Sequence, residues 1–151
     1  MSGVTGDDLL RRPVRMRGIQ LGRAVDLLLH PTEPHALGLD VLCGDDRHRF
    51  LPCSAATLRE DHVEASSPLA LLDLRDDSFY RREARALGRL RGTPLEGGSL
   101  QDVVLGPGWA VVELVLDGER VPLDGIVLPG RPERRSSRLP RPRGRRRRRS
   151  R

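Results

Sequence analysis

The sequence predicts an all-β protein made of two small antiparallel β units that pack together, are joined by a short helix, and end in a disordered, Arg-rich C-terminal tail. Two segments, residues 22–29 and 51–58, recur in the same order as residues 98–105 and 121–128. Between the members of each pair, apolar residues alternate with other residues. Because these strand-like segments recur in one order, we expect a duplicated β unit.

The first unit is expected at residues 9–72, after a small and acidic start at residues 1–8 that we expect to be frayed. An apolar run interrupted only by Asp26 predicts a strand buried on at least one face. Pro31 and Pro34 end that strand, because proline donates no ladder hydrogen bond. The elements expected here are an extended segment from Pro13, a turn at Arg17 and Gly18, strands at 24–29, 37–41 and 47–51, and a turn at 44–46.

The second unit is expected at residues 89–130. The triplet Gly106-Pro107-Gly108 is a short connection suited to two antiparallel strands, and Asp117-Gly118 is a strong hairpin turn. We therefore expect strands at 100–105, 109–116 and 119–123, with a last short strand at 126–128.

A helical connector is expected between the units, at residues 73–88. Asp76, Asp77 and Ser78 are suited to cap a helix that runs through Phe79, Glu83, Ala86 and Leu87.

Charge divides the chain sharply. Residues 1–130 contain 15 Arg and 20 acidic residues, a net charge of −5, whereas residues 131–151 contain 12 Arg and one acidic residue, a net charge of +11. The tail contains one apolar residue, Leu139, so it cannot bury enough surface to offset its ordering entropy. A run of guanidinium groups is typical of a phosphate-binding anchor. The residues expected to bind a polyanion are Arg141, Arg143, Arg145, Arg146, Arg147, Arg148, Arg149 and Arg151.

The sequence predicts a cytoplasmic protein with reduced thiols. The first thirteen residues contain no apolar stretch typical of a secretory signal, and we expect no transmembrane segment. Cys43 and Cys53 are the only cysteines, and both are expected to be small buried residues.

Several motifs together resemble the PRC-barrel family, which includes the H subunit of the photosynthetic reaction centre and the C-terminal domain of a ribosome maturation factor. The motifs are Pro13-Val14, residues 21–26 with their Gly-x-x-x-Asp spacing, residues 37–39 and residues 50–52. The match covers residues 9–65, and residues 88–130 are similar but more diverged. The resemblance implies small antiparallel β-barrels with no catalytic element.

The chain departs from that family in two respects. Cys53 and Leu123 stand where family members commonly have an aromatic residue after the proline. The transmembrane helix of the reaction-centre members and the N-terminal domain of the maturation factor have no counterpart here, so neither a photosynthetic role nor a contact with a ribosomal protein carries over.

Two sets of residues invite a reading in terms of reaction chemistry. Asp26 and Asp102 recur at equivalent places, but no catalytic partner recurs beside them. We therefore expect each aspartate to lie on a wet strand face or to accept backbone N–H groups at a turn. The spacing of Cys43, Cys53 and the four histidines, His30, His35, His48 and His62, fits a structural zinc site poorly. We expect no catalytic residue, no cofactor and no metal.

Trp109 is either a core residue or a platform for a base or a partner side chain. Together these observations predict a non-enzymatic adaptor or scaffold that docks an unidentified protein partner and binds RNA, DNA or the ribosome through its tail. The alternative is a structural or regulatory module without nucleic-acid binding, which contacts anionic lipid at the membrane surface.

Overall fold

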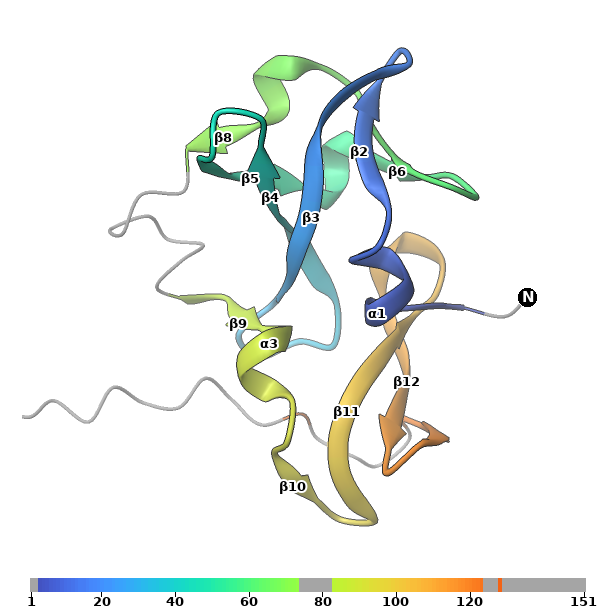
Figure 1. The fold of residues 1–151 in the computed structure, drawn as a ribbon. Coiled ribbons are helices and arrows are strands. Elements are labelled where there is room, and N and C mark those ends of the chain that lie inside the picture. The colour runs from blue at the N-terminus through green and yellow to red at the C-terminus, as the bar shows by residue number, and fades with distance from the viewer. Residues whose placement is uncertain (1–2, 74–82, 124–127, 129–151) are drawn as a thin grey trace, which may run out of the picture.

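The structure is a computed structural model, and it describes residues 3–73, 83–123 and 128 (Figure 1). These residues form mostly β-strands with a few helical turns, so the expected all-β class is confirmed. The strands are β1 (Val4–Thr5), β2 (Pro13–Met16), β3 (Ile19–Leu29), β4 (Ala36–Cys43), β5 (His48–Pro52), β6 (Ala56–Leu58), β7 (Val63–Ala65), β8 (Leu72–Asp73), β9 (Arg85–Ala86), β10 (Pro94–Leu95), β11 (Gly98–Leu105), β12 (Val111–Leu116) and β13 (Glu119–Pro122). The helical elements are α1 (Gly6–Leu9), α3 (Leu87–Leu90), η1 (Cys53–Ala55), η2 (Pro68–Ala70) and η3 (Pro107–Trp109).

The strands form two curled sheets (Figure 1). The first has the order β6-β7-β2-β3-β4-β5-β8, with β9 paired to β3, and it curls into a half-barrel. Its ladders are antiparallel except for the parallel pair β2 and β7. The second has the order β1-β11-β12-β13, with β10 paired to β11, and it is antiparallel.

The expected hairpin turns are present and have a common cause. Arg17 and Gly18 have φ values of 49° and 81°, and Asp117 and Gly118 have φ values of 48° and 87°. Two successive residues with positive φ match the twist of the flanking antiparallel strands, and glycine takes this conformation at little cost.

The two central ladders share one pattern of irregularities. Between β3 and β4 the register shifts before Asp26 and again before Leu29. Between β11 and β12 it shifts before Asp102 and again before Leu105. In each ladder the extra residue lies in the long strand at the first shift and in the partner strand at the second, and such bulges bend the strands and allow a small sheet to curl.

Each sheet takes one short strand from the other part of the chain. β1 pairs with β11, matching Val4 with Leu105, while β9 pairs with β3, matching Arg85 with Leu29. The expectation of a frayed start is therefore wrong for residues 4–8, which lie in β1 and α1. Their partner strand is about a hundred residues away, so composition alone does not reveal the pairing.

The connector differs in part from the expected helix. Residues 74–82 lie outside the described part of the chain, and so do residues 126 and 127 of the expected last strand. Ala86 belongs to β9 rather than to a helix, because its backbone pairs with Leu28, and the four-residue α3 begins at Leu87. Leu128 is buried but is not in a strand.

One aliphatic core contains residues of both sheets. It includes Leu27 and Leu39 from the first sheet and Val103 and Leu114 from the second, all fully buried. With few aromatic residues, the protein relies on Leu, Val and Ala to exclude water. In the residues that the structure covers, no helix combines the length and apolar character needed to cross a bilayer.

Candidate functional site

The residues expected to bind a polyanion, Arg141 to Arg151, lie outside the described residues. Trp109 is described, and its side chain is half-buried against the core at the end of η3. Its φ of 63° lies in the left-handed region, which is rare for a bulky residue. The preceding Gly108 also has a positive φ, of 70°, so the chain turns sharply at these two residues.

The two aspartates have the same structural role. Asp26 Oδ1 accepts the N–H groups of Leu27 at 2.9 Å and of Gly88 in α3 at 3.0 Å. The carboxylate of Asp102 accepts the N–H of Val103 at 2.8 Å and that of Asp7 in α1 at 2.9 Å. Each aspartate thus ties its own strand to a four-residue helix from the other part of the chain. The expectation that they accept backbone N–H groups is confirmed.

The surroundings of Asp26 include a second carboxylate. Asp40 is its cross-strand partner, and Asp40 Oδ1 lies 2.8 Å from His48 Nδ1. Burial raises the pKa of Asp26 above its usual value and the charge of Asp40 raises it further, although hydrogen bonds from Gly88 and Leu27 oppose the shift.

The cysteines are free thiols with structural positions. Cys43 is buried, and its Sγ lies 3.8 Å from the carbonyl oxygen of Val41. Cys53 is half-buried, and burial raises the pKa of its thiol to about 12. A nucleophilic cysteine requires a thiolate, so Cys53 is unsuited to that role near neutral pH.

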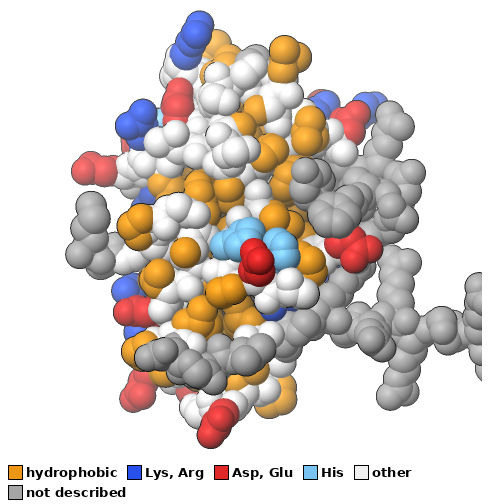
Figure 2. All heavy atoms as spheres, turned by 180° about the vertical axis from the view of Figure 1, so that it is seen from behind, with side chains coloured by type: hydrophobic (Ala, Val, Ile, Leu, Met, Phe, Trp, Pro, Cys, Tyr) orange, Lys and Arg blue, Asp and Glu red, His pale blue; other side chains and the backbone are white. Residues whose placement is uncertain are grey.

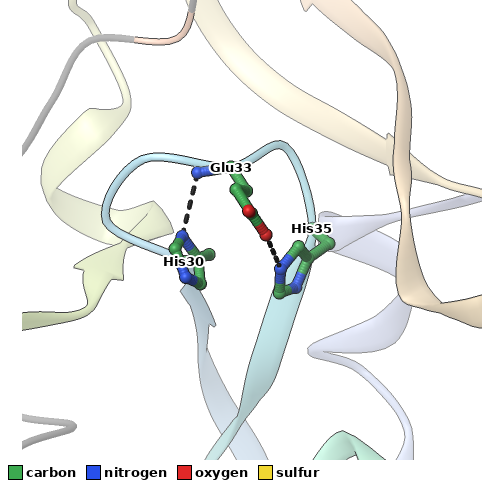
Figure 3. Close-up of side chains that lie close together, drawn as sticks. All are labelled: His30, Glu33 and His35. Atoms are coloured by element: carbon green, nitrogen blue, oxygen red, sulfur yellow. Dashed lines mark hydrogen bonds and ion pairs between the residues drawn. The ribbon is translucent and has the colours of Figure 1, made fainter.

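Of the residues considered for zinc, the structure brings together His30 and His35, with Glu33 between them in the loop that joins β3 to β4 (Figure 3). One ligand atom from each lies within 4.8 Å of the others. Elsewhere in the described chain, His48 is engaged by Asp40, and His62 is engaged by Asp61 and Glu64. Sequence reasoning missed this group as a set because it left Glu33 out, although the spacing H-x-x-E-x-H, with Pro31 and Pro34 inside it, is visible in the sequence.

The hydrogen bonds of His30 limit what this group can bind. His30 Nδ1 accepts the N–H groups of Thr32 at 3.1 Å and Glu33 at 2.9 Å. Because that nitrogen is an acceptor, the proton of the neutral ring is on Nε2, and neither nitrogen offers a free lone pair. Glu33 and His35 alone provide two ligands, whereas zinc sites use three or four protein ligands. The group therefore does not fit zinc in this conformation.

The same contacts describe a rigid loop. His35 Nε2 lies 2.9 Å from Glu33 Oε2, and His35 Nδ1 lies 3.2 Å from the Ala36 carbonyl oxygen. Both ring nitrogens thus lie beside an oxygen atom. The His30 and His35 rings lie 4.8 Å apart between centroids, which closes the loop on itself.

Arg85 holds this loop through hydrogen bonds from its guanidinium group. Its side chain is only 3% exposed. Nε donates to the carbonyl oxygen of His30 at 2.5 Å, Nη2 to that of Glu33 at 3.0 Å and Nη1 to that of Leu128 at 3.4 Å. The loop, β9 and Leu128 are thus joined by one guanidinium group. Sequence reasoning missed Arg85, because it is one of many arginines and no local pattern distinguishes it.

The loop lies beside the segment that carries Trp109. His35 and Ala110 form an isolated antiparallel bridge, and the N–H of Val111 donates to the carbonyl oxygen of Pro34 at 2.9 Å. We call the surface formed by residues 30–35 and 106–112 the loop face. Figure 2 shows the histidines and an acidic side chain on it amid hydrophobic side chains, and Val112 there is 42% exposed.

No protein-family model matches the chain, and no curated protein matches it either. The resemblance to the PRC-barrel family therefore depends on the residues and spacings quoted above.

Proposed function

We propose that this protein is a non-enzymatic, cytoplasmic adaptor of the PRC-barrel type. Two related β units, residues 9–72 and 89–130, form a body that docks a protein partner. The Arg-rich tail, residues 131–151, binds RNA or DNA, free or in the ribosome.

The charge division carries this proposal. A tail of net charge +11 attracts nucleic acid through phosphate contacts and counterion release, whereas a body of net charge −5 supplies no net attraction of its own. The tail contains no aromatic residue, so stacking does not select a sequence, and its binding depends on charge. A protein with this division holds its body near a polyanion and leaves the body surface open to another partner.

The loop face supports the docking role. It combines the half-buried indole of Trp109 and the exposed Val112 with the neighbouring loop of residues 30–35, which Arg85 and the Glu33–His35 pair hold by hydrogen bonds. Rigid aromatic anchors surrounded by small apolar groups are typical of the centre of a protein interface.

The aspartates support a role without catalysis. A general base needs a carboxylate oxygen free to reach a substrate proton. Both oxygens of Asp102 accept backbone N–H groups, and Asp26 Oδ1 accepts two, so these carboxylates serve the fold.

The tail is tested by a salt series on the full chain. Replacing the eight arginines from Arg141 to Arg151 by glutamine keeps the length and removes eight of the twelve positive charges of the tail. We expect the log–log salt slope for duplex DNA to become shallower by about 0.9 for each phosphate that the tail no longer neutralises. Equal slopes for the two proteins exclude the tail as the anchor. Flotation with anionic vesicles, with and without competing RNA, tests whether the tail prefers lipid.

The loop face is tested by crosslinking in native cells, with nuclease treatment to separate direct from RNA-mediated partners. Trp109→Ala is expected to lose a nuclease-resistant partner that the wild-type chain retains. Ile19→Ala is the control, because Ile19 is an exposed large apolar residue that lies in the β2–β3 hairpin, outside the loop face. Retention of every partner by Trp109→Ala contradicts the proposal for this face.

A further inference from the structure

The second sheet carries an open groove that the proposed function does not use. It has a volume of about 720 Å³ and lies between the α1 region, the Gly92 turn and the β12–β13 hairpin. Polar groups line it, including Ser99 and Gln101, and Arg91 and Arg120 supply the positive charge. A groove of this size accepts a group much larger than water.

Both arginines remain available to a ligand. Arg91 Nη2 lies 3.7 Å from Asp7 Oδ1, and Arg120 Nη1 lies 4.0 Å from Glu113 Oε2. These distances are longer than those of charge-assisted hydrogen bonds, which are about 2.7–2.9 Å. Their side chains are 37% and 48% exposed, so neither guanidinium is buried in the fold.

The acidic groups in the groove are already engaged. The oxygens of Asp102 accept two backbone N–H groups, and Asp102 is only 7% exposed. Asp7 pairs with Arg91 and also with Arg11, whose Nη2 lies 3.3 Å from Asp7 Oδ2. Asp7 can therefore keep Arg11 as its partner when Arg91 turns to a ligand.

The first half of the molecule provides an internal comparison. The ladder registers place Asp40 where the second half has Val115, and Phe50 where it has Arg120. Phe50 is 1% exposed and packs with Leu28 and Ala84, so that position is closed and apolar. The shared ladder therefore does not require an arginine at position 120.

We propose that this groove binds a phosphate group of a nucleic-acid strand between Arg91 and Arg120. The inference rests on the proposed function, because it makes the groove the body's own contact with the strand that the tail attracts. Guanidinium forks are suited to phosphate oxygens, and the hydroxyl of Ser99 and the amide of Gln101 supply neutral donors.

The test uses the full chain with both arginines replaced, Arg91→Gln and Arg120→Gln. Binding of a fluorescent single-stranded oligonucleotide is measured over a salt series. We expect at least a fivefold loss of affinity, and a slope shallower by about 0.7, because the two arginines together neutralise one phosphate of the single strand. The matched control is Arg47→Gln with Arg89→Gln, which removes the same charge from two exposed arginines outside the groove.

An equal loss in the groove variant and the control overturns the inference, because the effect is then one of net charge. A second variant, Asp7→Asn, is expected to increase affinity by freeing Arg91 while its backbone N–H still reaches Asp102. Weaker binding by Asp7→Asn also contradicts the proposal that Arg91 binds a phosphate in this groove.

The outcomes separate this inference from the proposed function. The variant with the eight tail arginines replaced tests the tail, and weak residual binding that still requires Arg91 and Arg120 supports both proposals. If the tail variant binds as wild type while the groove variant loses affinity, the groove stands and the tail anchor fails. Inorganic phosphate and a mononucleotide serve as further probes, and the amide NMR signals of Gly92 and Gly118 report binding in the groove. If these signals shift with the mononucleotide but not with the oligonucleotide, the proposal that the ligand is a nucleic-acid strand is overturned.

Discussion

The two halves of the molecule use the same aspartate in the same way but surround it differently. Asp26 and Asp102 both follow a register shift in a long strand, and both accept the N–H of the next residue and of a residue in a short helix. Across the ladder, Asp26 faces Asp40 and its partner His48, whereas Asp102 faces Val115.

The comparison separates what the fold requires from what it allows. Features present in both halves, such as the aspartate, the two register shifts and the proline at the end of β5 and β13, serve the curled ladder. Features present in one half are free to serve a function. The Arg91–Arg120 groove belongs to the second half, and the loop of His30, Glu33 and His35 belongs to the first.

Removing each aspartate tests their equivalence, and we expect the largest effect at Asp102. Asp102→Ala leaves two backbone donors without their acceptor in a buried place, which costs about 3 kcal/mol of unfolding free energy. Asp26→Ala is expected to cost about 1–2 kcal/mol, because burial and Asp40 already disfavour its ionised form. Urea denaturation measures both. A larger loss at Asp26 contradicts the comparison.

Substitution of the two glycines that lie beside these aspartates tests the same difference between the two halves. A Cβ on Gly6 meets Asp102 Oδ1 and Leu87 Cδ2, both at 2.5 Å, so we expect Gly6→Ala to cost about 2 kcal/mol through overpacking. A Cβ on Gly88 first meets Asp26 Oδ2 at 3.2 Å, and alanine favours the helix by up to about 1 kcal/mol, so Gly88→Ala is expected to stay near wild-type stability. Thermal unfolding of both variants checks this order; equal losses contradict it.

How much of this fold is predictable depends on how far apart in sequence the partners lie. The hairpins are predictable because their turns and alternation are local, as at Asp117-Gly118. The backbone-binding role of Asp26 and Asp102 is one of two alternatives that the sequence leaves open, and the structure confirms it. β1 is not predictable in this way, because Val4 and Thr5 become ordered only by pairing with β11.

The candidate sites are harder to predict for the same reason. Glu33 and Arg85 act together across 52 residues of sequence, and the link is a side chain bound to a backbone carbonyl, which leaves no pattern of residue types. The groove likewise combines Arg91 and Arg120 from segments whose proximity depends on the curl of the second sheet. The tail, by contrast, is recognisable by composition alone.

Replacing Asp40, the residue that faces Asp26 across the ladder, is expected to change the pKa of Asp26 more than the free energy of unfolding. Because burial and Asp40 raise the pKa of Asp26, its contribution to stability is full below pH 3.8 and is lost as pH rises through the folded-state pKa. Asp40→Val, which copies Val115, is expected to lower the pKa of Asp26 and to move that loss to lower pH. Carboxyl NMR titration measures it. His48→Gln, which keeps Asp40, is the control, and an unchanged Asp26 midpoint in Asp40→Val excludes the proposed cause.

The smallest effect is expected at the β6–β7 hairpin, for which the described part of the second half has no counterpart. His62 Nδ1 lies 2.7 Å from Asp61 Oδ1, and its Nε2 lies 2.8 Å from Glu64 Oε2. These hydrogen bonds raise the pKa of His62, Asp61 first and Glu64 second. The stabilisation is therefore full below pH 6.5 and is lost as pH rises through the folded-state pKa.

The carboxyl groups of Asp61 and Glu64 determine how the stability of this hairpin falls at acid pH. The pKa of Asp61 is lowered chiefly by His62, and that of Glu64 chiefly by the N–H of Arg17 and then by His62, so their contributions are lost as pH falls. The measurement is amide hydrogen exchange at Val63, which pairs with Val14 of β2. After correction for the intrinsic rate, we expect this exchange to be slowest in mildly acid solution and faster at higher pH. In His62→Gln the rise above pH 6.5 should disappear, because no proton is left to lose. If the rise persists, a group other than His62 attaches this hairpin to the sheet.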